Sequence, residues 1–183
     1  FGKWDAPTAT RALCIMVYRT PELDYFAPSA PKFMKQLLDQ HNAAGIDYQG
    51  FYSDEMHIQF DWDFAHFGPH EIPTRYMTDN FQSVLSKDDA LFADFDKALI
   101  WFGYDMQVDR EMLGRKHTQH VIGRTPEALY ETFRMRRAYY ETLQDKVVGM
   151  CCEARDYIRA TYEKHKGWDP LCLGHATWQE SPT

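Results

Sequence analysis

One long amphipathic segment most constrains what this 183-residue chain can fold into. Over 126–165, apolar or small residues recur every three or four positions, which predicts a helix with one buried face: Leu129, Phe133, Tyr140, Leu143, Val147, Cys151, Ala154 and Ile158. Thr125 and Pro126 are typical of an N-cap and a first helical position. Such a helix would span about 60 Å at 1.5 Å per residue. That is long for one helix of an α/β domain, so we expect a break, with Gly149 as its weakest point.

The opposite side of this segment is rich in charge, and we expect it to be a solvated surface: Arg134, Arg136, Arg137, Glu153 and Arg155. A second helix is predicted over about 32–43, entered at Ser29 and Pro31 and ended by Gly45. Its apolar face would consist of Phe33, Leu37, Leu38 and His41.

Short apolar runs flank these helices and read as strands. Residues 11–19 (RALCIMVYR) and 46–52 enclose the helix over 32–43, which makes a strand–helix–strand unit with parallel pairing. Leu171, Cys172 and Leu173 read as a further short strand after the long helix. We therefore expect an α/β fold with a parallel sheet.

The stretch between these units is less regular. Residues 62–81 read as a loop rich in Gly, Pro and aromatics, and a helix is predicted over about 88–104, where Leu91, Phe95, Leu99 and Phe102 recur at helical spacing. The segment VDREMLGRKHTQHVIG after it is ambiguous. We treat 62–125 as an irregular and helical insertion within one domain, 1–183.

Composition excludes several classes of function. The net charge is −7 and 15% of the residues are aromatic, so the chain is neither disordered nor a basic nucleic-acid binder. No run of about 18 apolar residues occurs, which excludes a membrane-spanning helix.

The four cysteines form no CxxC pair, and we expect them to be small buried residues rather than a disulfide framework or a zinc site. No signal peptide precedes the first strand, and localisation is left open.

Carboxylates follow two of the predicted strands. In parallel α/β folds, chemistry lies beyond the carboxyl ends of the strands. Asp54 and Glu55 occupy that position after 46–52, and Glu180 lies in it after 171–173. Two carboxylates that flank one bond can cleave a glycosidic link, one as proton donor and the other as nucleophile or base. Adjacent residues of an extended segment point to opposite sides, so only one of Asp54 and Glu55 can face a cleft.

Aromatic and histidine side chains near these acids would bind a carbohydrate substrate by stacking and hydrogen bonding: Tyr52, His57, Trp62, His175 and Trp178. The alternative is that Asp54 and Glu55 only cap a turn or a helix.

A metal site is a weaker interpretation of the same region. Its candidate ligands are His57, Asp61, Asp63, His66, His70 and Glu71. His66 and His70 would share a face of a helix, but Gly68 and Pro69 argue against a helix there. His117 and His120 form a second, weaker cluster. No GxSxG elbow and no phosphate-binding glycine-rich loop occurs, and Cys151 and Cys152 lie in the predicted long helix. We expect no cofactor.

Two stretches resemble a known family. The run AAGIDYQGFYSDEMHI is similar to the strand of (β/α)₈ glycoside hydrolases that presents the acid/base glutamate, and LGHATWQES looks like a later strand of such a barrel. The resemblance implies that Glu55 is the general acid/base and Glu180 the nucleophile or second carboxylate. A whole barrel takes about 250 residues and eight strands. The expectation is therefore a partial (β/α)₈-like barrel with long helical insertions, 1–183 being a fragment of it, or a smaller α-rich α/β domain.

The sequence thus predicts a glycoside hydrolase that acts on an oligo- or polysaccharide. Two alternatives stay open: a non-catalytic carbohydrate-binding or assembly subunit, and a metal-dependent hydrolase that uses residues 57–71. Expected partners are a carbohydrate, and neither nucleic acid nor a membrane. The long helix could also pack against a second subunit or against the remainder of a longer chain.

Overall fold

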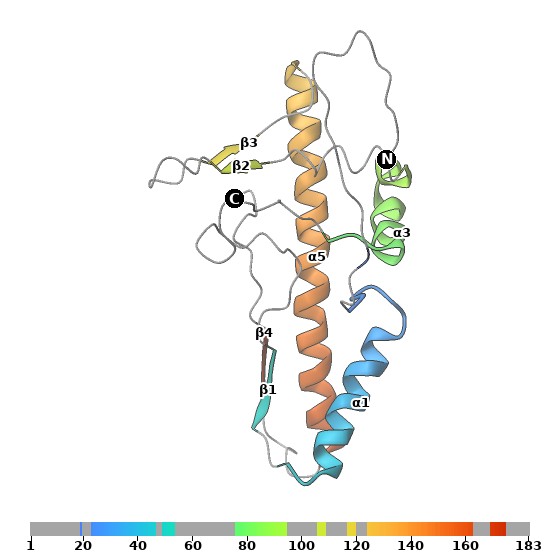
Figure 1. Cartoon of the computed structure of the whole chain (residues 1–183), viewed down its shortest axis with the longest axis vertical. Coiled ribbons are helices and arrows are strands. Elements are labelled where there is room, and N and C mark those ends of the chain that lie inside the picture. Colours follow the sequence, from blue (N-terminus) through green and yellow to red (C-terminus); the bar gives the residue numbers. More distant parts are fainter. Residues whose placement is uncertain are drawn as a thin grey trace.

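The protein has a mixed α/β fold organised around one long helix (Figure 1). The computed structural model describes residues 19, 23–46, 49–53, 76–94, 106–108, 117–119, 124–162 and 169–174. In chain order its elements are α1 (Ala30–Ala43), β1 (Gly50–Ser53), α3 (Asp79–Asp88), the 3₁₀ helix η1 (Ala90–Ala93), β2 (Met106–Val108), β3 (His117–Gln119), α5 (Pro126–Thr161) and β4 (Leu171–Gly174).

Helix α5 confirms the predicted long helix but not its break. The Thr125 hydroxyl accepts a hydrogen bond from the Ala128 amide at 3.2 Å, and Pro126 occupies the first turn, as expected for this start. The helix runs without interruption for 36 residues and passes through Gly149. A helical glycine costs only about 1 kcal/mol relative to alanine. Burial of Val147 and Met150 on either side of Gly149 explains why the prediction of a break was wrong.

The buried face of α5 matches the sequence pattern in its middle and carboxyl-terminal parts only. Buried apolar side chains from the predicted set are Tyr140, Leu143, Val147, Ala154 and Ile158. Leu129 and Phe133 are 45% and 40% exposed, whereas Thr132 and Met135 in the same part of α5 are buried. The charged face also needs a correction, since Arg136 is 1% exposed and its guanidinium lies 6.0 Å from the centre of the Phe133 ring.

Strands β1 and β4 form a parallel pair with Phe51 opposite Cys172 and Ser53 opposite Gly174. Because α5 separates them in the chain and contacts both, β1, α5 and β4 form a strand–helix–strand unit. The predicted strand at 171–173 is therefore confirmed, and the predicted strand at 46–52 is confirmed with a later start. The partner predicted for it, residues 11–19, lies outside the described residues apart from Arg19.

Helix α1 agrees with its prediction in extent and in its end. It starts at Ala30 with Pro31 in the first turn, and Gly45 follows it with a φ of +74°. Of the predicted apolar face, Leu38 is 2% exposed, whereas Phe33 is 50% exposed. Only part of this face is covered because α1 packs on a single helix, α5, within the described part of the chain.

The 62–125 region differs from its prediction. Of the helix predicted over 88–104, residues 95–104 lie outside the described residues. A helix lies at Asp79–Asp88 and starts there because Thr78 caps it by accepting a hydrogen bond from the Phe81 amide at 3.0 Å. Its first residues fall in the predicted loop, and η1 follows its end. The ambiguous segment, 108–123, contains β3 and the last residue of β2, and these two strands pair antiparallel with Gln107 opposite Thr118.

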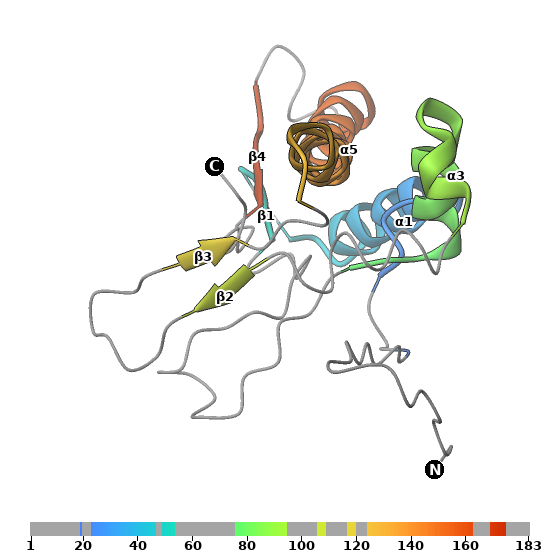
Figure 2. The ribbon, with the colours of Figure 1, turned by 90° about the horizontal axis from the view of Figure 1, so that it is seen from above.

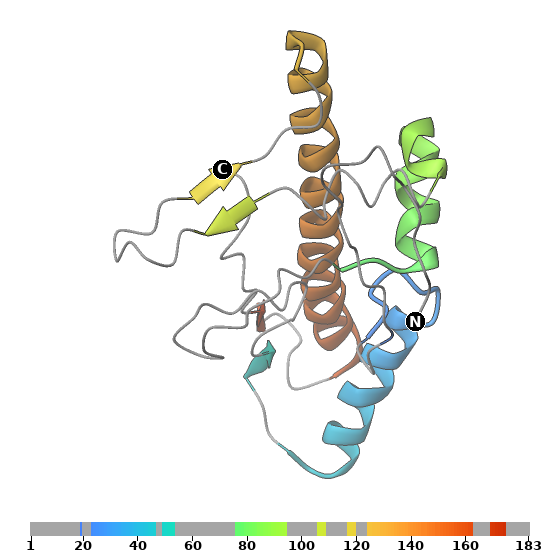
Figure 3. The ribbon, with the colours of Figure 1, turned by 45° about the horizontal axis from the view of Figure 1, so that its top comes forward.

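The described core has two parts, both built on α5. The larger is rich in aromatic residues and joins the middle of α5 to α3 and to residues near Tyr25. The smaller consists of Leu38, Ala154, Ile158 and Tyr162, with Phe51 and Cys172 packed against it. Figures 2 and 3 show the result: α5 lies between α1 and α3 on one side and the β1–β4 pair on the other.

Candidate functional site

The candidate site lies at the carboxyl edge of the β1–β4 pair. Ser53 and Gly174 are the last residues of the two strands and lie opposite each other in the parallel ladder. Neighbouring strands are about 4.8 Å apart. The chain continues from Ser53 into Asp54 and from Gly174 into His175. The two segments that the sequence singles out for chemistry therefore leave the same edge of one sheet.

The two faces of this strand pair have different surroundings. Phe51 and Cys172 point toward α5 and pack against the smaller core. The alternate residues Tyr52, Leu171 and Leu173 are 62%, 64% and 48% exposed. Because side chains alternate along a strand, these three belong to the face that points away from α5. Tyr52 lies opposite Leu173, so one aromatic and one aliphatic side chain are neighbours just before the edge.

Gly50 explains how the two strands approach at their start. A Cβ atom on Gly50 would lie far inside the contact distance of the Leu171 carbonyl oxygen, so no other residue fits here without moving the backbone. The close approach of Gly50 to Leu171 therefore aligns the starts of β1 and β4. Because both strands have four residues, it also aligns their carboxyl ends.

Two predicted site residues fall within the described part of the chain: Tyr52 is exposed at the edge, and His117 is the first residue of β3, opposite Val108. The remaining predicted residues lie outside the described residues: Asp54, Glu55, His57, Trp62, His66, His70, His175, Trp178 and Glu180. The same is true of Asp61, Asp63, Glu71 and His120. Their assignment stays a prediction.

Two of the thiols near the site, those of Cys151 and Cys172, are weakened as nucleophiles by burial. Cys151 and Cys172 are half-buried and Cys152 is exposed, and none of the three forms a disulfide. Burial raises the pKa of the Cys151 and Cys172 thiols, so less thiolate is present at neutral pH. The expectation of buried cysteines holds in part, since Cys152 lies on the surface of α5. No set of three or more His, Cys, Asp or Glu side chains within the described ranges is arranged to hold a metal ion.

A carboxylate cluster that the sequence analysis missed lies between residues 23–26 and the start of α3. The Asp24 carboxylate accepts hydrogen bonds from the Asn80 amide at 2.7 Å, the Thr78 hydroxyl at 2.9 Å and the Tyr76 hydroxyl at 3.2 Å. Burial opposes ionisation of Asp24, but these bonds and one from the Phe26 amide outweigh it and lower the pKa of the carboxyl. Through these bonds Asp24 joins the loop at 23–26 to the start of α3.

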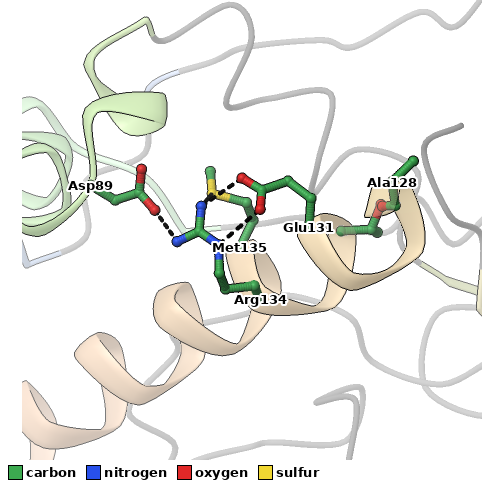
Figure 4. A network of polar contacts seen from close by, with 6 residues as sticks. Asp89, Ala128, Glu131, Arg134 and Met135 are labelled. Atoms are coloured by element: carbon green, nitrogen blue, oxygen red, sulfur yellow. Dashed lines mark hydrogen bonds and ion pairs between the residues drawn. The ribbon is translucent and has the colours of Figure 1, made fainter. Parts of the chain in front are cut away.

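A second missed cluster joins Asp89, at the C-cap of α3, to α5. Figure 4 shows the Arg134 guanidinium between the carboxylates of Asp89 and Glu131. Its Nη2 atom is 2.6 Å from a Glu131 oxygen, and the pair of carboxylates raises the pKa of Arg134. Arg134 binds both carboxylates and so joins α5 to the end of α3, which indicates a structural role. A pattern search could not find this contact, because Asp89 and Arg134 are distant in the sequence.

Comparisons with known proteins identify no relative. The chain matches no known protein family, no curated protein and no solved structure. Along the described part of the chain, no helix is both long enough and apolar enough to cross a membrane.

Proposed function

We propose that this protein is a glycoside hydrolase whose site lies at the carboxyl edge of β1 and β4. The observation that carries the proposal is the parallel pairing that ends both strands together, with Ser53 opposite Gly174. Acids follow both strands, Glu55 shortly after β1 and Glu180 shortly after β4. Most enzymes that cleave glycosidic bonds use a pair of carboxyl groups that flank the bond. Two chain segments that leave one sheet edge can supply them.

We further propose that the strand pair belongs to a larger, barrel-like parallel sheet. Parallel sheets are normally covered on both faces. Here α5 covers the face with Phe51 and Cys172, while Tyr52, Leu171 and Leu173 leave the other face apolar and exposed. In a (β/α)₈ barrel, helices cover the outside and the opposite faces of the strands fill the interior. The exposed apolar face suits such an interior.

In this proposal Glu55 is the general acid and Glu180 is the nucleophile or the base for a water molecule. A separation of about 5–5.5 Å between the two carboxyl groups would give retention at the anomeric carbon, and about 6.5–9.5 Å would give inversion. Tyr52 would support a sugar ring beside the reacting bond, because its exposed ring offers an apolar surface next to a polar edge.

The test is turnover of a panel of nitrophenyl glycosides and soluble polysaccharides by four proteins. These are the wild type, Glu55→Gln, Glu180→Gln and a control, Glu153→Gln, which changes an exposed acid on α5. We expect both site variants to lose at least 100-fold in kcat, since each removes a group that acts in the transition state. The control should keep wild-type activity. Wild-type turnover that Glu55→Gln leaves intact would exclude the assignment.

A non-catalytic carbohydrate-binding subunit is the second candidate, and the exposed Tyr52 ring favours it. If the site only binds, titration calorimetry should detect an oligosaccharide with the wild type and with Glu55→Gln alike. Tyr52→Ala should then weaken binding by about tenfold, the effect expected for one lost stacking contact.

A further inference from the structure

Local turns cannot fix the stagger of β1 against β4. A hairpin turn sets the register of an antiparallel pair, but parallel strands are joined by long crossovers. Here β1 starts after α1, which ends at Ala43, and β4 starts after α5, which ends at Thr161. Contacts between the ends of the two helices therefore act on the relative position of the two strands, in addition to the close approach of Gly50 to Leu171.

Asp39 of α1 makes such a contact. Its carboxylate accepts a hydrogen bond from the Tyr162 hydroxyl at 2.7 Å and another from the Tyr157 hydroxyl at 2.9 Å. Tyr162 occupies the C-cap position of α5 and is 8% exposed. Lys35, one turn before Asp39, places its ammonium group 5.5 Å from the centre of the Tyr157 ring. One carboxylate thus binds both aromatic side chains at the end of α5.

Strands β1 and β4 both pack beside this contact between α1 and α5. Leu38, the residue before Asp39, packs with Ala154 and Ile158, and the side chains of Phe51 and Cys172 pack against this cluster. Phe51 and Cys172 are also directly opposite each other in the ladder. Short segments of the chain also join the end of α1 to β1 and the end of α5 to β4, so a shift of α1 along α5 would move the point from which β1 starts relative to that of β4.

We propose that Asp39 is a positioning residue that sets the stagger of β1 against β4, by joining the ends of α1 and α5 through Tyr157 and Tyr162. A slip of one residue in a strand moves it by about 3.3 Å and turns each side chain to the other face. The consequence for Glu55 and Glu180, namely that Asp39 keeps them at a reactive distance, rests on the proposed glycosidase function.

The stagger itself can be tested without a substrate. The readout is the nuclear Overhauser effect between the backbones of Phe51 and Cys172. In Asp39→Ala this cross-strand contact should weaken or move to a neighbouring residue. Amide exchange in β1 and β4 should rise about tenfold, whereas exchange at Leu143 in the middle of α5 should stay within twofold of wild type. Tyr162→Phe should give part of this effect, and Asp39→Asn, which keeps one acceptor oxygen, should restore most of the contact.

Asp156→Ala is the matched control, because Asp156 is an exposed carboxylate near the end of α5 whose ion pair is with its own neighbour in the helix, Arg155. A uniform rise in amide exchange with the Phe51 to Cys172 contact unchanged would overturn the proposal, since that result indicates general destabilisation. If Asp39→Ala fails to fold, Asp39→Asn and Tyr162→Phe decide the question by the same readouts.

Where wild-type turnover exists, Asp39→Ala should lower kcat about tenfold and leave KM within twofold. If wild-type turnover is absent, the proposed function fails while the test of the stagger stands.

Discussion

Ser53 and Gly174 are paired across two parallel strands, although α3, η1, β2, β3 and α5 separate them in the chain. A pair of four-residue strands is not stable on its own. Its position depends on α5, against which Phe51 and Cys172 pack. The position of the candidate site therefore depends on the stability of α5 and on the packing of β1 against β4. Substitutions at Gly149 and Gly50 change these two properties separately.

Replacement of Gly149 by alanine should stabilise the protein. Gly149 lies inside α5, has a helical conformation and has no atom within 4 Å of the position that a Cβ would take. Alanine lowers the conformational entropy of the unfolded chain, and the expected gain is about 1 kcal/mol. For a protein of this size the melting temperature should rise by about 2–4 °C in calorimetry. The control Gly45→Ala should lower it, because the φ of Gly45 is +74°.

Replacement of Gly50 by alanine should have the opposite effect on the strand pair. The new Cβ would overlap the backbone of Leu171, so β1 and β4 must separate at their start. We expect a loss of about 2 kcal/mol or more in the free energy of unfolding. Amide exchange should rise first in residues 50–53 and 171–174. Wild-type exchange in these strands would contradict the close approach of Gly50 to Leu171.

The sequence predicts the elements whose signals are local. Thr125 and Pro126 mark the start of α5, Gly45 marks the end of α1, and the apolar run Leu171 to Leu173 marks β4. Each signal depends on neighbouring residues only, which explains why these predictions are confirmed.

The predictions of side-chain exposure that were wrong depend on contacts between segments that are distant in the sequence. Arg136 is buried although its neighbours Arg134 and Arg137 reach solvent, and Leu129 is exposed although it continues an apolar stripe. Whether a helical position is covered depends on which distant segment packs there, and no spacing rule contains that information. For the candidate site, the sequence predicted that strand ends would present the chemistry, and the pairing of β1 with β4 agrees in topology. The roles of Glu55 and Glu180 stay predictions, because they depend on side-chain geometry beyond the two strands.

Loss of the Arg134 charge should destabilise the protein more than loss of a neighbouring surface charge. Arg134 binds Asp89 and Glu131, and its side chain is 35% exposed beside the 15% exposed Asp89. Arg137 pairs with Glu141 on the same helix, and its side chain is 77% exposed. In urea unfolding, Arg134→Gln should cost about 1 kcal/mol and Arg137→Gln less than about 0.5 kcal/mol, because solvent screens exposed pairs. Equal costs would show that the contact with Asp89 contributes nothing.

Removal of metal ions distinguishes the carboxylate mechanism from a metal-dependent hydrolase. If Glu55 and Glu180 carry the reaction, dialysis against a chelator should leave turnover within twofold of the untreated protein. If residues 57–71 hold a catalytic metal, activity should fall and return on addition of a divalent cation. Elemental analysis of the dialysed protein provides the control that any metal has been removed. His66→Ala should lower activity only in the second case.

The Asp24 cluster predicts a dependence of stability on pH. Hydrogen bonds from Asn80, Thr78, Phe26 and Tyr76 hold the pKa of Asp24 below its ordinary value of 3.8 despite the opposing effect of burial. A carboxyl whose folded pKa is lowered stabilises the protein above its unfolded pKa, and this contribution disappears as the pH falls through the folded pKa.

The measurement compares wild type with Asp24→Asn by urea unfolding between pH 6 and pH 2.5. Above about pH 5 the variant should be less stable by about 1 kcal/mol, a value that allows for the partial exposure of Asp24. Below pH 3.8 the difference should shrink, because the unfolded chain takes up a proton at Asp24 first, and at lower pH the folded carboxyl is protonated too and resembles the amide. Thr78→Val should remove one of the bonds and move this loss to higher pH. A difference between wild type and Asp24→Asn that stays constant across the whole range would contradict the lowered pKa.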